Sequence, residues 1–166
     1  MTTIERTSSN PYLANNLAPV HEEVTVSDLR VTGTIPAELT GRYLRNGPNP
    51  AGSVDEKSYH WFLGHGMVHG VRLDEGRAAW YRNRWVRTKD VCDVLGGTPP
   101  PSDWPDGHAS FSANTNVIGH AGRTYAIVEG GSAPVELSYE LDTVRVSNFG
   151  GTLPHAFSAH PKRDPK

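Results

Sequence analysis

Three of the chain's eight histidines lie within ten residues, in the stretch HWFLGHGMVHG, and imidazole is a common metal ligand. His60, His65 and His69 are spaced H-x4-H-x3-H. A helical zinc motif needs paired histidines on one helix face and a nearby acid. The glycines, β-branched residues and aromatics here instead predict a strand, a Gly-His-Gly turn and a second strand. That arrangement places His69 in an apolar row, so we interpret it as a hydrogen-bonded core residue rather than a ligand.

Two other residues stand in positions where chemistry is conceivable. Glu129 ends the apolar stretch RTYAIVE, in which alternation places it on the strand face of Tyr125 and Ile127. A carboxylate there is costly to bury without a partner, so its ordinary interpretation is a rim residue in water. His160 lies in FSAHPKRDPK, between small residues and a proline that fixes the backbone, and is ordinarily a polar turn residue. The residues alone leave both interpretations open.

The composition favours a β-rich protein and argues against a nucleic-acid partner. The 17 glycines and 13 prolines are spread between short apolar runs, which is typical of many short strands. The 16 Lys and Arg against 18 Asp and Glu give a formal charge of −2, without the basic excess of nucleic-acid binders. Cys92 is the only cysteine, and neither a signal-peptide pattern nor an apolar run of membrane-spanning length is present, so we expect a cytoplasmic protein.

Short strands separated by turn signals must position these residues. Residues 1–20 lack periodicity and are interpreted as an N-terminal arm. Residues 90–111 are rich in proline and glycine and are predicted to form a loop that lines a site. Many short strands indicate a sandwich, a barrel or a propeller, and the pattern does not choose among them. The expected strands cover 24–31, 41–45, 58–63, 67–73, 78–87, 114–118, 123–129 and 135–137.

Four stretches together resemble the carotenoid cleavage oxygenases, the family that includes apocarotenoid and lignostilbene dioxygenases. They are YLRNGPNP from Tyr43, HWFLGHGMVHGVRL from His60, NTNVIGHAGRTYAIVEGGSAPVEL from Asn114 and FSAHPKRDP from Phe157. The resemblance runs from about Pro19 to the last residue, with the stretches in the family's order and spacing.

The resemblance implies an all-β fold, a seven-bladed β-propeller with Fe(II) on its axis held by four histidines from separate blades. It implies that His160 is the first of these ligands in chain order and that Glu129 is a glutamate that hydrogen-bonds a ligand histidine. Neutral imidazole suits Fe(II), and an acceptor on its other ring nitrogen fixes tautomer and orientation. The implied reaction is cleavage of a carbon–carbon double bond in a carotenoid, apocarotenoid or stilbene by O2, giving carbonyl products. An apolar conjugated small molecule and O2 are thus the implied partners, with peripheral membrane contact of the full-length protein.

The length departs from the family, whose members run to several hundred residues. The chain stops just after the first implied ligand, so we expect residues 21–166 to form the first blades of an incomplete propeller and the isolated fragment to be inactive. Three alternatives stay open. A non-catalytic binding module or remnant would give Glu129 and His160 no role, and an isomerohydrolase would use the same iron scaffold. A metallohydrolase built on the three clustered histidines would lack the acid of an HExxH motif.

Overall fold

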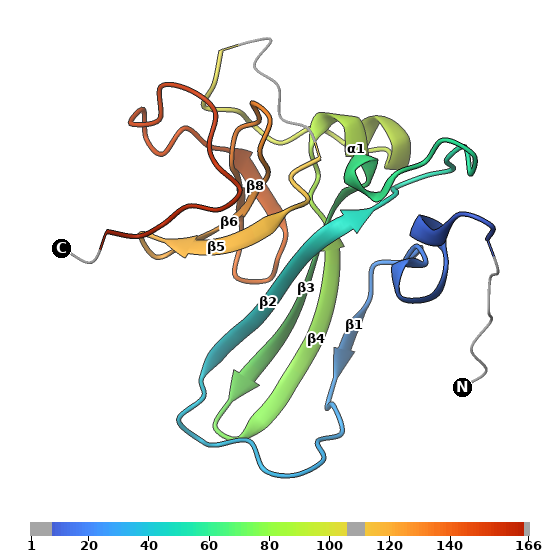
Figure 1. The fold of residues 1–166 in the computed structure, drawn as a ribbon. Coiled ribbons are helices and arrows are strands. Elements are labelled where there is room, and N and C mark those ends of the chain that lie inside the picture. The colour runs from blue at the N-terminus through green and yellow to red at the C-terminus, as the bar shows by residue number, and fades with distance from the viewer. Residues whose placement is uncertain (1–7, 106–111, 165–166) are drawn as a thin grey trace.

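The computed structural model describes residues 8–105 and 112–164, and this part of the chain is mostly β-sheet, as predicted. Two four-stranded antiparallel sheets are ordered β1-β4-β3-β2 and β5-β6-β7-β8. In Figure 1 the long strands β2, β3 and β4 lie side by side, and the second sheet lies beside one end of them. The strands are β1 Thr25–Ser27, β2 Gly41–Asn49, β3 His65–Asp74, β4 Arg77–Trp85, β5 Asn116–His120, β6 Arg123–Ile127, β7 Val135–Leu137 and β8 Thr143–Val146. The described helices are α1 Lys89–Leu95 and 3-10 helices at Pro11–Leu13, Asn15–Leu17 and Trp61–Leu63.

Two tight turns set the hairpins that build the sheets. Glu75 and Gly76 connect β3 to β4 with φ of 46° and 79°, and Ala121 and Gly122 connect β5 to β6 with φ of 48° and 75°. Positive φ at both central residues is the type I′ geometry, whose twist matches that of the flanking strands. The sequence predicts both turns, from DEG and from GHAG.

The two sheets bury a common apolar core. Val68 and Trp80 of the first sheet pack in one cluster with Ala126, Val135 and Leu137 of the second. All five side chains are at most 8% exposed. Since burial of apolar area is the main favourable contribution to folding, this cluster holds the sheets together.

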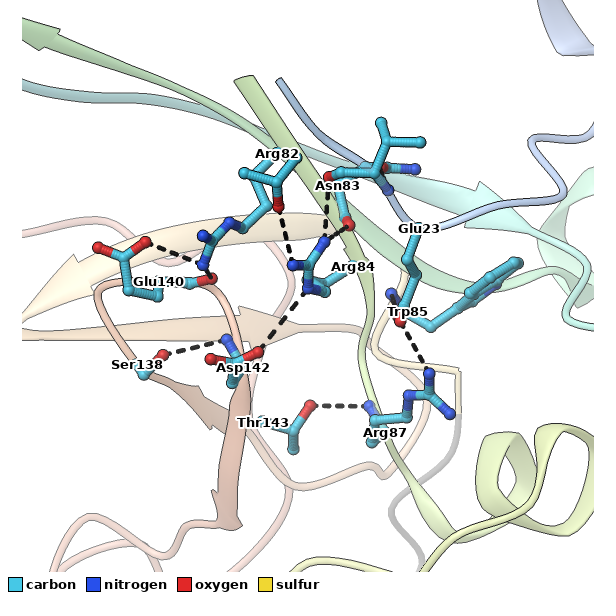
Figure 2. A network of polar contacts seen from close by, with 12 residues as sticks. Glu23, Arg82, Asn83, Arg84, Trp85, Arg87, Ser138, Glu140, Asp142 and Thr143 are labelled. Atoms are coloured by element: carbon cyan, nitrogen blue, oxygen red, sulfur yellow. Dashed lines mark hydrogen bonds and ion pairs between the residues drawn. The ribbon is translucent and has the colours of Figure 1, made fainter. Parts of the chain in front are cut away.

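Polar contacts fix the turn at residues 138–142, which joins β7 to β8, against the first sheet (Figure 2). The guanidinium of Arg82 donates to the backbone oxygen of Glu140 at 3.0 Å and lies 2.9 Å from its carboxylate. The guanidinium of Arg84 lies 3.8 Å from the carboxylate of Asp142. Single exposed ion pairs contribute little, but a network with backbone acceptors adds geometric constraint. These arginines therefore help to set how the two sheets are placed relative to one another.

The segment that leads into the short strand β1 is tied to β4 by side-chain contacts. Asn83, which is fully buried, accepts a hydrogen bond from the amide of Val24 at 2.7 Å and donates to the backbone oxygen of Glu22 at 2.8 Å. The carboxylate of Glu23 accepts from the amide of Trp85 at 2.8 Å. Because all three residues of β1 are exposed, its pairing with β4 and these polar contacts just before it, rather than apolar burial, tie it to the sheet.

The strand predicted at 58–63 is wrong. Trp61–Leu63 is a 3-10 helix, because the side chain of His60 accepts a hydrogen bond from the amide of Phe62 at 3.2 Å and caps the turn. The ring of Tyr12 packs on His60 with centroids 4.4 Å apart, so this run of aromatics forms a cluster instead of pairing with a strand. The predicted Gly-His-Gly turn is also wrong, because β3 already begins at His65.

Three further boundaries differ from the predictions. The predicted loop 90–111 begins as α1, whose Val91 and Cys92 are buried, and its residues 106–111 lie outside the described part of the chain. The strand predicted at 24–31 is confined to β1, and β8 was not expected. Within the described ranges, no helix has the length and apolar character to cross a bilayer.

Candidate functional site

The structure brings Glu129 and His160 together. The ring nitrogen Nε2 of His160 lies 3.6 Å from the carboxylate oxygen Oε1 of Glu129. The prediction that the strand extends to Glu129 is wrong, because β6 ends at Ile127. Gly130 and Gly131 follow with φ of 81° and 99°, which turns the chain away directly after Glu129. Both side chains are about two-thirds exposed, at 64% and 66%, which agrees with the interpretation of Glu129 as a rim residue.

The pair fits one arm of a metal site but does not complete one. An imidazole whose one nitrogen faces a carboxylate has its other nitrogen available to a metal ion. In this rotamer Nε2 faces Glu129, and the separation is slightly longer than a hydrogen bond. Over residues 8–105 and 112–164, no three His, Cys, Asp or Glu side chains come together as a metal site. At this point the described residues therefore place one imidazole beside one carboxylate.

A groove of about 870 Å³ lies over the first sheet, and Glu129 is part of its wall. Its lining is rich in aromatic side chains, and the remainder includes small and polar residues from β2 and from the segment before β5. Concave surfaces with apolar walls and few polar groups are typical of small-molecule sites. The lining includes Tyr12, Tyr43, Tyr59, Trp61, Phe62, Tyr81, Arg45, Asn46, His69, Thr115, Val128 and Glu129.

The prediction that the 90–111 loop lines the site is not supported by its described part. Trp104 donates from its indole nitrogen to the backbone oxygen of Ser147 at 2.9 Å, beside β8, and Phe111 lies outside the described residues. Tyr43 and Tyr81 line the groove instead, from the long strands β2 and β4. The signal that could have found them is that each directly adjoins an apolar residue of the core side, Leu44 beside Tyr43 and Trp80 beside Tyr81, so alternation turns the two tyrosines to the other face.

The three clustered histidines have separate surroundings. The ring of His65 accepts from the amide of Ala51 at 3.1 Å, and His60 caps the 3-10 helix described above. Nδ1 of His69 is 2.8 Å from the hydroxyl of Tyr81, so the prediction that His69 is hydrogen-bonded is confirmed. The prediction that it belongs to the core is wrong, because the side chain is only partly buried and lines the groove. Burial, and secondarily the charge of Arg45 opposite, lower the pKa of His69 below its ordinary value.

This lowered pKa predicts a pH dependence of stability. Since the folded state binds the proton of His69 less readily than the unfolded state, the free energy of unfolding should fall as the pH drops below about 6.5, through the folded pKa. His69→Gln removes this titration, so the difference in stability between the parent and the variant should shrink or reverse on acidification and stay constant above neutral pH. Urea unfolding at a series of pH values checks this, and parallel curves for the two proteins would contradict it.

Comparison with known proteins identifies the family. The family model described as retinal pigment epithelial membrane protein matches residues 17–166. A carotenoid cleavage oxygenase of Mycobacterium tuberculosis is 56% identical over 167 residues, which cover 99% of this chain and 33% of that protein. The crystal structure of a lignostilbene dioxygenase of Pseudomonas brassicacearum superposes with a TM-score of 0.77 at 27% identity, over 95% of this chain and 35% of that one.

A structure of cobalt-substituted apocarotenoid oxygenase of Synechocystis superposes with a TM-score of 0.73 at 29% identity, over 89% of this chain and 34% of that one. The chain thus spans about a third of the length of the relatives it matches. The matched family model covers nearly the whole sequence, including both Glu129 and His160. The chain belongs to the carotenoid cleavage oxygenase family.

Proposed function

We propose that this chain is part of a non-haem Fe(II) dioxygenase that cleaves a carbon–carbon double bond of a carotenoid, apocarotenoid or stilbene with O2. The observation that carries the proposal is the distance of 3.6 Å between the ring of His160 and the carboxylate of Glu129. Glu129 also lines the aromatic groove. Proteins use a carboxylate beside a ligand histidine to fix its tautomer and orientation. The names of the relatives support the oxygenase class and an apolar, conjugated substrate.

Each side of the pair has a distinct task in this proposal. Bound Fe(II) would supply the activation of O2. His160 would present one ring nitrogen to the metal. Its other ring nitrogen would donate a hydrogen bond to the carboxylate of Glu129. Contacts at such sites are often long before the site is assembled, and both exposed side chains can rotate by the small amount that a hydrogen bond requires.

The groove would bind the substrate. Its aromatic side chains, among them Tyr43 and Tyr81, offer flat apolar ring faces on which a conjugated hydrocarbon chain can lie. Neither surface gives up hydrogen bonds to water in this contact. Because Glu129 is part of the same wall, a molecule in the groove would pass close to the pair. The position of the molecule along the groove would then select the bond that is cleaved.

The proposal requires donors beyond this chain. Each four-stranded sheet is proposed to be one blade of a β-propeller, since both are antiparallel and follow one another along the chain. A single imidazole does not hold Fe(II) usefully. The other ligands would come from segments that the longer relatives contain, and the 166-residue chain alone is therefore proposed to be inactive.

The test is a chimeric oxygenase, in which this chain replaces the 167 aligned residues of the M. tuberculosis relative. With Fe(II) and O2, it should convert an apocarotenoid or a stilbene to aldehydes or ketones, and removal of the metal by a chelator should stop the reaction reversibly. The parent relative serves as the control for assembly. A rearranged alcohol in place of carbonyl products would favour an isomerohydrolase. Folded chimera that neither binds Fe(II) nor turns over would overturn the proposal and leave the binding-module alternative.

A further inference from the structure

Asn116 contacts both the strand that leads to Glu129 and the segment that carries His160. It is the first residue of β5 and pairs with Ile127, the last residue of β6, two positions before Glu129. Its side-chain nitrogen donates to the backbone oxygen of Ala159 at 3.1 Å. Ala159 is fully buried and directly precedes His160. Asn116 therefore connects the strand that leads to Glu129, with which it pairs, to the backbone that presents His160, which its side chain reaches.

Asn116 is itself held on its other side by Asn46 of β2. The side-chain nitrogen of Asn46 donates to the backbone oxygens of Ala113 at 2.7 Å and Asn116 at 3.0 Å. This orientation leaves the buried oxygen Oδ1 of Asn46 without a partner among the described residues, so the two donated bonds decide how the amide lies. Ser112 and Ala113 have φ of 59° and 31°, a conformation that persists only where the surroundings enforce it. Asn46 therefore braces the strained segment that leads into Asn116.

Besides the bond from Asn116, a few contacts hold the segment that carries His160, among them the edge-to-face packing of Phe157 on Phe149. The segment follows β8 without regular secondary structure, and the amide of His160 bonds only locally, to the hydroxyl of Ser158 at 3.1 Å. The amide of Phe157 reaches the oxygen of Ser132 at 3.3 Å, and Arg163 reaches the oxygen of Gly119 at 3.4 Å. The bond from Asn116 is shorter than these two and lies between them, next to His160.

We propose that Asn116 is a positioning residue, which holds the backbone at Ala159 so that the ring of His160 meets Glu129, and that Asn46 braces Asn116 in turn. This inference rests on the proposed function, in which His160 is a metal ligand. A ligand held within a fraction of an ångström binds its metal more tightly than one on a loose segment, because less order must be created on binding.

The test compares two matched asparagine variants of the chimeric oxygenase. Asn116→Asp keeps an oxygen that can accept from the amide of Val117, as Asn116 does at 2.8 Å, but removes the donor to Ala159. Asn148→Asp is the control, because Asn148 also accepts from a backbone amide, that of Gly151 at 2.7 Å, and donates to a backbone oxygen, that of Asp103 at 3.0 Å. Both changes remove one hydrogen bond of the same kind, but the bond of Asn148 does not reach the His160 segment.

The measurements are the affinity for Co(II), read by titration, and the visible absorption spectrum of the bound ion, which reports its coordination. We expect Asn116→Asp to weaken Co(II) binding by about 10–100-fold and to change the spectrum, as loss of an outer-sphere partner does. Asn148→Asp should match the parent in both. If Asn116→Asp does not fold, Asn116→Ser removes the same donor without adding a charge, and the same result is expected.

The arms of this experiment separate the inference from the function on which it rests. If the parent binds Co(II), His160→Ala does not, and the Asn116 variants match the parent, the positioning role is wrong and the proposed function stands. Equal weakening by Asn116→Asp and Asn148→Asp would also overturn the positioning role, since a general loss of stability then explains both. If His160→Ala binds Co(II) as the parent does, the proposed function fails and the inference fails with it.

Discussion

Replacing His160 with alanine in the chimeric oxygenase is expected to lower the rate of alkene cleavage by more than about 100-fold. Loss of an outer-sphere partner alone costs up to about that factor, and loss of a ligand should exceed it. The measurement is the initial rate of carbonyl formation at saturating substrate, together with the iron content of each purified protein. His160→Ala should lower both the rate and the iron content, because in the proposed site the side chain supplies a donor atom, and at 66% exposure it makes little packing contact.

His155→Ala is the matched control for this prediction. His155 is exposed and lies five positions before His160, on the same irregular segment after β8. Its replacement should leave the rate and the iron content unchanged. Glu129→Gln provides an intermediate case, since the amide keeps the size of the side chain but loses its charge. Equal rates for the parent, His155→Ala and His160→Ala would contradict the assignment.

Gly66→Ala is expected to cost the folded chain about 3 kcal/mol, the upper part of the range for overpacking. A methyl group on Gly66, in β3, would lie 2.3 Å from the backbone oxygen of Ala113 and 2.7 Å from that of Ser112. Backbone atoms cannot move aside as a flexible side chain can. The segment that must shift is also the one that leads to Asn116, so the variant should weaken metal binding in the chimera as well.

Gly47→Ala is the control for Gly66→Ala. Gly47 lies on β2 opposite Met67, next to the pair formed by Pro48 and Gly66, and a methyl group there meets nothing within 4 Å. Alanine in a strand interior is favoured over glycine by about 0.5–1 kcal/mol. The free energy of unfolding of this variant should therefore equal or exceed that of the parent. Urea unfolding of the three proteins measures the difference. A loss for Gly47→Ala as large as that for Gly66→Ala would show that the close approach of Ala113 is not the cause.

Local patterns predicted the parts of this fold that local physics determines. The alternation around Val71 and the turns DEG and GHAG depend on residues adjacent in sequence, and β3, β4, β5 and β6 lie close to their expected places. The failures depend on contacts from elsewhere. Residues 58–63 have strand-like side chains, but the cap by His60 and packing on Tyr12 make part of them helical. Tertiary context overrides propensity in such segments.

The candidate site could be predicted only in part for the same reason. Position in the sequence singled out Glu129 and His160, but their roles came from the resemblance, because neither alternation nor spacing brings two residues so far apart in sequence together. In our proposal their proximity depends on the register of β5 on β6 and on the bond between Asn116 and Ala159, and neither of these can be read from a sequence pattern. Asparagine is disfavoured in strands, and Asn46 within β2 and Asn116 at the start of β5 are the signal that was available.

The most direct test of the central claim is a crystal structure of the chimeric oxygenase loaded with iron, with anomalous diffraction recorded at the iron absorption edge. The proposal that His160 holds the iron beside Glu129 predicts one strong anomalous peak at coordination distance from one ring nitrogen of His160. It also predicts a hydrogen bond from the other ring nitrogen to the carboxylate of Glu129. An iron peak that His160 does not contact, in a chimera that cleaves its substrate, would contradict it.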